Sequence, residues 1–258
     1  MRYKICLDAG HYGKINRSNV YPSYYESNMT WKLYLLLKKE LEKYGFEVIG
    51  TRDNKDVDLD LHLRGMKAKG CDLFISLHSN ACENESVDRA VVIPYQDVNW
   101  TNIDDKSRAI AEKLGACVTD VMELSSYQIY PKKADYDRDG NGKLDDEYYG
   151  VLYGSRKVGV AGVIVEHGFH TNTYCAKWLS EDSNLEKLAK AEAKVIADYF
   201  GIKNTDNEPS AWSKEAVEWA IKNKILQGDE NGDYKLRDNC TTERFITLLY
   251  RAIKNIGE

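Results

Sequence analysis

The chain of 258 residues has no long hydrophobic segment; its apolar runs are short pieces such as residues 5–7 and 163–165. A helix needs about 20 consecutive apolar residues to cross a bilayer, so we expect no membrane span. The N-terminus carries Arg2 and Lys4, but Asp8 interrupts the apolar run that follows them. A secretory signal peptide needs a longer apolar stretch, so we expect a protein made in the cytoplasm without one.

Proline and glycine are scarce, and charge of neither sign dominates. Four prolines and 18 glycines exclude a collagen-like or disordered chain. The 36 basic and 41 acidic residues leave a net charge of −5. Because duplex binding depends on neutralising phosphates, this balance predicts no nucleic-acid partner. The six cysteines form no CxxC pair, and in a cytoplasmic protein this favours free thiols.

Strand-like and helix-like segments alternate over the first 200 residues. Helical spacing of apolar residues predicts helices, and short apolar runs predict strands. The predicted helices span 26–44, 59–69, 104–124 and 185–200, and the predicted strands span 3–7, 46–49, 72–77, 89–95 and 163–165. This alternation indicates an α/β fold with a mixed, largely parallel sheet flanked by helices. In such sheets the chemistry collects at the carboxyl ends of the strands.

A polar stretch separates this region from a smaller C-terminal one. Residues 203–210 read KNTDNEPS, which is typical of a linker. We therefore predict a main domain over 1–202 and a small all-α module over 211–258. A module of this size has little core of its own, so we expect it to dock on the main domain or on a copy of itself.

Within the module, the pattern predicts two helices joined by a turn. The helices would span 213–223 and 241–253, with the turn over 228–233. Ser213 and Thr241 are suitable N-cap residues for these helices, because their hydroxyl oxygens can accept from the first backbone N–H groups.

Two histidines end apolar strands: His11 closes ICLDAGH, and His78 closes LFISLHSNA. One such histidine is more often structural, but two at one edge of a sheet favour a metal site. Zinc takes imidazole and carboxylate ligands, and a catalytic zinc keeps one position for water. Glu26, at the start of the first long helix, can supply a third ligand. The alternative for Glu26 is a carboxylate that stabilises the helix N-terminus.

A further carboxylate, Glu166, follows the apolar strand GVIV in the segment VEHGFHTN. Burying a carboxylate at the end of such a strand is costly unless it is paired or functional. Beside a metal and its water, Glu166 can act as a general base. The alternative is a buried ion pair, for which Arg64 is a candidate partner.

The motifs DAGHYG, Glu26 ahead of a helix, ISLHSNA and VEHGFHTN together resemble the zinc-dependent N-acetylmuramoyl-L-alanine amidases of the amidase-3 type. The motifs follow the family's order, and the resemblance covers about residues 1–201. These enzymes cleave the amide between the lactyl group of muramic acid and the first L-alanine of the peptidoglycan stem. The resemblance implies zinc held by His11, Glu26 and His78, with Glu166 as the catalytic base.

Four other residues receive lesser roles from the same comparison. Arg64 matches a family arginine in the helix before the third strand, and we expect a structural or orienting role for it. His167 and His170 lie within VEHGFHTN where the family varies, so we interpret them as peripheral. His62 lies on a helix face and is expected to be solvated.

An acidic segment, ADYDRDGNGKLDDEYY, departs from the family pattern and reads as an insertion at about 127–150. It resembles a calcium loop, in which alternating carboxylates surround a turn glycine. The candidate ligands are Asp135, Asp137, Asp139 and Asp146. A second register, from Asp137, places Tyr148 at the twelfth position, so neither register is complete. The alternative is an acidic surface loop near the rim of the active site.

The C-terminal segment resembles a single S-layer-homology module, with the elements WSKEAVEWA, a Gly-Asp turn and TTERFITLLYR. Such modules attach proteins to secondary cell-wall polysaccharides and commonly act in threes. A single copy therefore predicts either weak wall binding or self-association. The alternative is a helical hairpin that covers the catalytic domain.

These observations predict a peptidoglycan amidase with a wall-attachment module. Two other functions stay open: a zinc peptidase that cuts within the stem peptide, and a non-catalytic wall-binding protein. The expected absence of a signal peptide favours a phage or prophage endolysin that acts on the wall after release through a separate pore. A mother-cell enzyme of sporulation is the second setting.

Overall fold

The computed structural model divides the chain into two compact units, residues 1–201 and residues 202–258. The residues that it describes are 2–95, 104–138, 140–143, 146–202, 209–229, 232–236 and 238–256. Most of the predicted linker over 203–210, and part of the predicted turn over 228–233, therefore lie outside the described residues.

The first unit is built on a six-stranded sheet with the order β2-β1-β3-β6-β4-β5. The strands are β1 (Lys4–Ala9), β2 (Glu47–Gly50), β3 (Leu73–Asn80), β4 (Ala90–Pro94), β5 (Tyr127–Ile129) and β6 (Gly162–Phe169). All neighbouring strands are parallel except β4 and β6, which are antiparallel. The predicted mixed, largely parallel sheet is confirmed.

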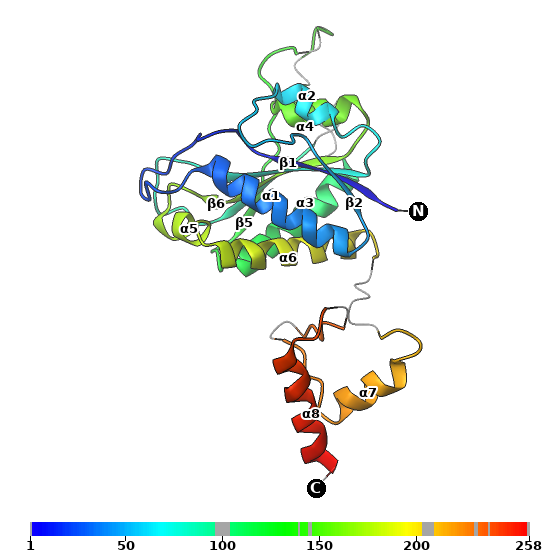
Figure 1. The fold of residues 1–258 in the computed structure, drawn as a ribbon. Helices are drawn as coiled ribbons and strands as arrows, with labels where there is room; N and C mark the ends of the chain where they lie inside the picture. The colour runs from blue at the N-terminus through cyan, green and yellow to red at the C-terminus, as the bar shows by residue number, and fades with distance from the viewer. Residues whose placement is uncertain are drawn as a thin grey trace. The chain divides into compact units, whose positions relative to one another are not determined.

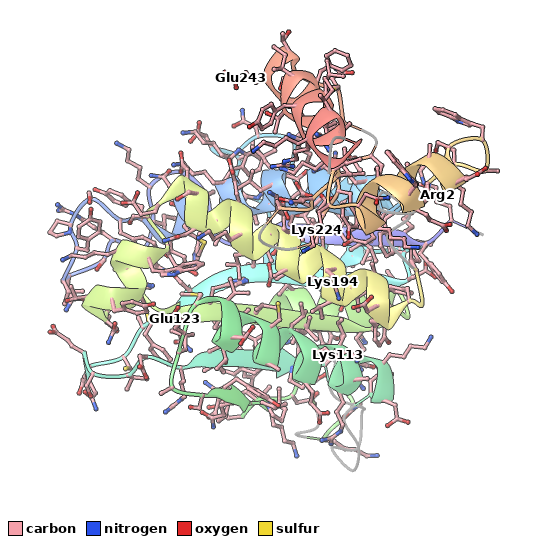
Figure 2. The ribbon with its side chains drawn as sticks, turned by 90° about the horizontal axis from the view of Figure 1, so that it is seen from below. Arg2, Lys113, Glu123, Lys194, Lys224 and Glu243 are labelled. Carbon is pink, nitrogen blue, oxygen red and sulfur yellow. The ribbon has the colours of Figure 1, made fainter. Side chains whose placement is uncertain are left out.

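Helices cover both faces of this sheet (Figure 1). They are α1 (Glu26–Lys43), α2 (Leu61–Met66), α3 (Asp105–Val121), α4 (Gly150–Lys157), α5 (Thr173–Trp178) and α6 (Asp182–Tyr199). α1, α3 and α6 lie on one face, and the short pair α2 and α4 lies on the other. Figure 2 shows α3 and α6 side by side, carrying Lys113 and Lys194.

α1 illustrates how the sequence pattern becomes a packed helix. Met29, Leu33, Leu37 and Leu41 recur at helical spacing and are buried against the sheet. The helix ends before Gly45, whose φ of 84° lies in the left-handed region that glycine adopts without strain. This helix brings its first residue to the carboxyl edge of the sheet.

The pattern did not predict β5, α4 or α5. α4 contains two glycines, which weaken the local preference for a helix by about 1 kcal/mol each. Their role is tertiary, since a Cβ on Gly154 would lie 2.2 Å from the carbonyl oxygen of His62 in α2. A Cβ on Gly65 of α2 would likewise lie 2.0 Å from the carbonyl oxygen of Val151. Glycine on both helices allows their backbones to touch, and this packing overrides local propensity.

A buried ion pair ties α2 to the end of β1. Arg64 donates from Nε to Asp8 Oδ1 (2.8 Å) and from one terminal nitrogen to Asp8 Oδ2 (3.0 Å). Thr51 and Ser76 donate their hydroxyls to the same carboxylate at 2.5 and 2.7 Å. Asp8 has no exposed surface. The alternative pairing of Arg64 with Glu166 is therefore wrong, because both carboxylate oxygens that Arg64 contacts belong to Asp8.

The second unit contains α7 (Lys214–Lys222) and α8 (Thr242–Ile256). Thr241 caps α8, since its Oγ1 accepts from the backbone N–H of Arg244 at 3.1 Å. Ser213 precedes α7, but its hydroxyl donates to the carbonyl of Ser210 and makes no capping bond. α8 exposes several apolar side chains, including Phe245 and Leu249. None of the helices described here is both long and apolar enough to span a bilayer.

Candidate active site

Three potential metal ligands converge at the carboxyl edge of the sheet. His11 follows β1, Glu26 is the first residue of α1, and His78 lies near the end of β3. Their ligand atoms all lie within 4.8 Å of one another. Across the described ranges this is the only group of three or more His, Cys, Asp or Glu side chains placed to hold a metal ion. The three residues selected from the sequence are therefore neighbours in space.

Glu26 lies between the two histidines. Its Oε2 is 3.2 Å from His11 Nε2, and its Oε1 is 3.0 Å from His78 Nδ1. The backbone N–H of Ser79 donates to Oε1 at 2.9 Å, and Asn16 Nδ2 donates to Oε2 at 2.7 Å. These bonds fix the carboxylate with one oxygen facing each imidazole ring. Asn16 was not selected from the sequence, since a lone asparagine in a loop carries no pattern.

Gly10 allows this close approach of β1 to His78. A Cβ on Gly10 would lie 2.5 Å from Cε1 of the His78 ring and 2.6 Å from the carbonyl oxygen of Leu77. Non-bonded atoms do not approach so closely, so any side chain here must displace the ring or the strand. The following residue, His11, has a φ of 58°, which turns the chain out of the strand and places its ring beside Glu26.

The donor set fits a divalent cation. Glu26 is almost completely buried. Burial alone would raise its pKa, but hydrogen bonds with His11 and His78 outweigh burial and hold the pKa well below its usual range. An ionised carboxylate facing two imidazole nitrogens at 3.0–3.2 Å needs either protons or a cation between them. Imidazole nitrogen and carboxylate oxygen are zinc ligands, and three protein ligands are the number found in catalytic zinc sites.

Glu166 lies on β6 directly beside this cluster, in register with His78 on the neighbouring strand. Its Oε2 is buried, and no hydrogen-bond donor among the described residues reaches that oxygen. Burial raises the pKa of Glu166 well above its usual range, and the charge of Glu26 raises it further. Glu26 at the start of α1 and Glu166 on β6 thus have opposite electrostatic environments at the same edge of the sheet.

The other three histidines lie outside the cluster of potential metal ligands. His167 is completely buried, with Nδ1 2.8 Å from the carbonyl oxygen of His78 and Nε2 2.9 Å from Glu192 of α6. His170 is also buried, 3.0 Å from Ser79 Oγ. Both lie outside the cluster of His11, Glu26 and His78, and their contacts support the strand that carries His78. His62 lies edge-on against the Tyr153 ring and is half-buried, so its side chain is less exposed to solvent than expected.

The acidic loop is held by its own backbone. Asp137 accepts from the N–H groups of Gly140, Asn141 and Gly142 at 2.8, 3.2 and 2.8 Å. Asp146 is buried and accepts from the N–H of Arg138, whereas Asp135 is exposed. Asp139 lies outside the described residues. Calcium binding by this loop stays a prediction.

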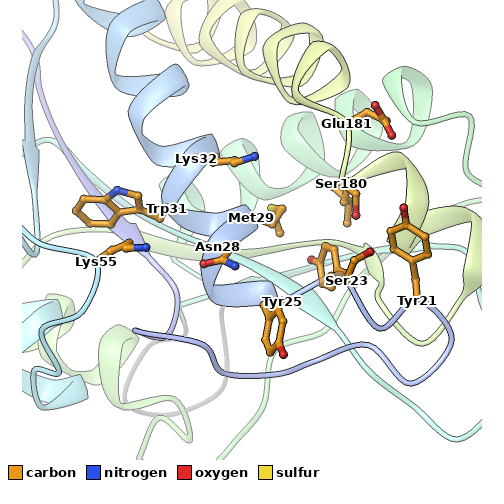
Figure 3. A pocket seen from close by; sticks show the side chains of 12 residues that line it. Tyr21, Ser23, Tyr25, Asn28, Met29, Trp31, Lys32, Lys55, Ser180 and Glu181 are labelled. Carbon is orange, nitrogen blue, oxygen red and sulfur yellow. The ribbon is translucent and has the colours of Figure 1, made fainter.

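A cavity of about 550 Å³ opens beside the first turns of α1 (Figure 3). Tyr25 and Asn28, which flank Glu26 in the chain, line it together with Trp31. Figure 3 shows Lys55 on the same side as Trp31, and Ser180 and Glu181 on the far wall. Its volume lies within the range of ligand sites, and it combines aromatic and polar walls as such sites do.

A His/Glu/His cluster beside a buried carboxylate oxygen that no described donor reaches, at the carboxyl edge of an α/β sheet, is the arrangement expected of a metal-dependent hydrolase. Residues 5–198 match the family described as N-acetylmuramoyl-L-alanine amidase (Amidase_3), which is about three quarters of the chain. The chain belongs to this family, and the prediction of a peptidoglycan amidase is confirmed. A comparison with curated proteins gave no match.

Solved structures share the fold. The catalytic domain of CwlV, an amidase from Bacillus (Paenibacillus) polymyxa var. colistinus, has a TM-score of 0.62 at 19% identity, over 78% of this chain and 99% of that one. CwlD of Clostridioides difficile, solved with the GerS lipoprotein, has a TM-score of 0.61 at 21% identity, over 78% of this chain and all of that one. Cwp6 of Clostridium difficile has a TM-score of 0.64 at 20% identity, over 77% of this chain and 29% of that one.

The close approach at Gly10 generates a testable prediction. Gly10→Ala should displace the His78 ring and lower the stability by about 1–3 kcal/mol, the usual cost of overpacking. It should also reduce the rise in Tm that zinc produces, because a ligand stabilises only a fold that binds it. Thermal unfolding with and without zinc measures both effects.

The matched control is Gly115→Ala on α3, away from the cluster, where the new Cβ would lie 2.6 Å from the ring of Tyr127 on β5. This variant should lose stability and keep the full zinc-induced rise in Tm. An unchanged rise in Gly10→Ala would show that Gly10 does not shape the metal site.

Proposed function

We propose that the chain hydrolyses the amide bond between N-acetylmuramic acid and L-alanine of peptidoglycan with a zinc ion held by His11, Glu26 and His78. The observation that carries the proposal is the convergence of these ligand atoms within 4.8 Å beside the unpaired buried oxygen of Glu166. When bound, zinc polarises the scissile carbonyl and lowers the pKa of water to about 7.

Glu166 and Glu26 have separate roles in this reaction. Glu166 accepts the proton of the attacking water at its carboxylate and returns it to the alanine nitrogen as the amide bond breaks. Burial, which raises the pKa of Glu166, makes its carboxylate a stronger base than an exposed glutamate. Glu26, with its pKa held low, stays ionised as a ligand. The opposite pKa shifts of Glu26 and Glu166 thus suit the first to metal binding and the second to proton transfer.

Substitutions at these four positions separate metal binding from proton transfer. Glu166→Gln keeps the side-chain shape and should retain zinc near one per chain while hydrolysis falls on the order of 10²–10⁴-fold. His11→Ala and His78→Ala leave two ligands, too few for a stable site, so zinc and activity should fall together. Glu26→Gln should lose both more mildly, because an amide oxygen is a poorer ligand. Metal analysis and muropeptide release are measured on the same preparations.

Glu112→Gln, an exposed change on α3, serves as the matched control and should alter neither property. If Glu166→Gln loses zinc while Glu26→Gln keeps it, the two glutamates have been assigned the wrong way round. Mass spectrometry of the products tests the reaction itself. Whole stem peptides and bare glycan strands identify an amidase, whereas cuts inside the stem identify a zinc peptidase.

For the second unit we propose wall attachment by an S-layer-homology-like module, through a secondary cell-wall polysaccharide or through self-association. The motif resemblance supports this, together with the apolar side chains that α8 exposes, among them Phe245, Ile246 and Leu249. All four proposed active-site residues lie before residue 167, in the other unit.

Cutting the chain after Asn204 tests this division. The fragment 1–204 should bind zinc and cleave soluble muropeptides like the full chain, while its pelleting with purified walls should drop. A fragment that pellets with walls as well as the full chain does would remove the attachment role from the second unit.

We propose further that the enzyme meets the wall after release from the cytoplasm, as a phage or prophage endolysin. A wall-degrading unit joined to a wall-attachment unit keeps the enzyme on its substrate, which supports this setting. Producing cells should lyse only when a separate membrane pore is opened, followed as loss of turbidity. Wall digestion confined to sporulating mother cells would favour the second setting instead.

A further inference from the structure

We propose that Ser76 and Asp8 are positioning residues for the metal ligand His78, holding its ring in the tautomer that leaves Nδ1 free for the metal. The inference rests on the proposed zinc site and assigns a role to two buried residues that the sequence analysis did not select. Neither residue is one of the three potential ligands in the metal cluster.

A chain of short contacts connects the ring to the buried ion pair. His78 Nε2 lies 3.1 Å from Ser76 Oγ, and Ser76 Oγ lies 2.7 Å from Asp8 Oδ2. Ser76 and Asp8 have no exposed surface, so no solvent competes for these bonds. The opposite nitrogen of the ring, Nδ1, lies 3.0 Å from Glu26 Oε1 in the metal cluster.

The direction of each bond follows from what each group can donate. Asp8 is a carboxylate, an acceptor only, and it already accepts from Arg64 and Thr51. The single hydroxyl proton of Ser76 therefore goes to Asp8 Oδ2. Ser76 Oγ is left with lone pairs, so its bond with the ring requires the proton to be on His78 Nε2.

A neutral imidazole carries one N–H, so a proton on Nε2 leaves Nδ1 unprotonated, with a lone pair that can bind a metal. That lone pair faces Glu26 Oε1, which is also an acceptor. A metal ion satisfies both atoms. Without the Ser76 anchor, the favoured arrangement of the metal-free ring places the proton on Nδ1, where it bonds to Glu26 and competes with the metal.

Arg64 acts on the His78 ring indirectly, through Asp8. Its two bonds to Asp8 fix the plane of that carboxylate, so that Oδ2 faces Ser76 while Oδ1 accepts from Thr51. The orienting role expected for Arg64 thus has a physical path, through Asp8 and Ser76 to the His78 ring. Groups that orient a metal-bound histidine in this way typically change metal affinity by about 10–100-fold.

Ser76→Ala in the full chain is the sharpest test, because it removes the link and leaves the Asp8–Arg64 pair in place. Zinc affinity, measured by competition with a chelator, should weaken about 10–100-fold. Nitrogen-15 NMR of the metal-free protein, at a pH where the ring is neutral, should show His78 protonated on Nε2 in the natural chain and shifted toward Nδ1 in the variant. Ser76→Thr, which keeps a hydroxyl, should restore much of both properties.

Ser155→Ala is the matched control, since Ser155 is equally buried and its hydroxyl donates to the carbonyl of Leu152, on the α4 side of the sheet. It should leave zinc affinity and the His78 tautomer unchanged. Equal zinc affinity in Ser76→Ala and the natural chain, or a natural chain with the proton on Nδ1, overturns the proposal. A natural chain that binds zinc with the Nε2 tautomer and yet cleaves no muropeptide would sink the proposed function and leave this inference standing.

Discussion

The buried pair of Asp8 and Arg64 is the interaction on which the arrangement of the site depends. Placing two charges in the interior costs several kcal/mol, which only good geometry and further hydrogen bonds offset. Asp8 meets this condition with two bonds from Arg64 and one each from Thr51 and Ser76. The pair joins β1, α2 and β3 at the edge where the ligands converge. Removing one member of such a pair leaves an uncompensated charge, which typically costs about 3–5 kcal/mol.

Around this pair, the same edge of the sheet holds carboxylates in three different states. Asp8 is neutralised by an arginine, Glu26 is held ionised by two imidazoles, and Glu166 is buried with an oxygen that no described donor reaches. Only Glu166 combines an available lone pair with a raised pKa. The proposed proton transfer therefore falls to the carboxylate with an oxygen that no described donor reaches.

Much of this could be read from the sequence, and the limits have physical causes. Helical spacing located α1, and the strand-end histidines located the cluster, because both follow from local periodicity. The sequence pattern did not predict α4, because its glycines serve a contact with α2, which is distant in sequence. The buried roles of Asp8 and Glu192 were not predicted either. Each is an acidic residue in an otherwise apolar pattern, Asp8 within KICLDA and Glu192 on the buried face of α6. An acid on a buried face signals a partner, but the partner's identity is set by the fold.

The strand order has a consequence for how the enzyme matures. β6 lies between β3 and β4, although it follows both in the chain. A nascent chain can assemble β1, β2 and β3 with all three ligand residues while the edge of β3 is still open. Glu166 enters only when β6 inserts into that gap, a pairing of high sequence separation and therefore slow to form. In this order the proposed ligands would gather before the proposed base, and hydrolytic competence would mark completion of the sheet.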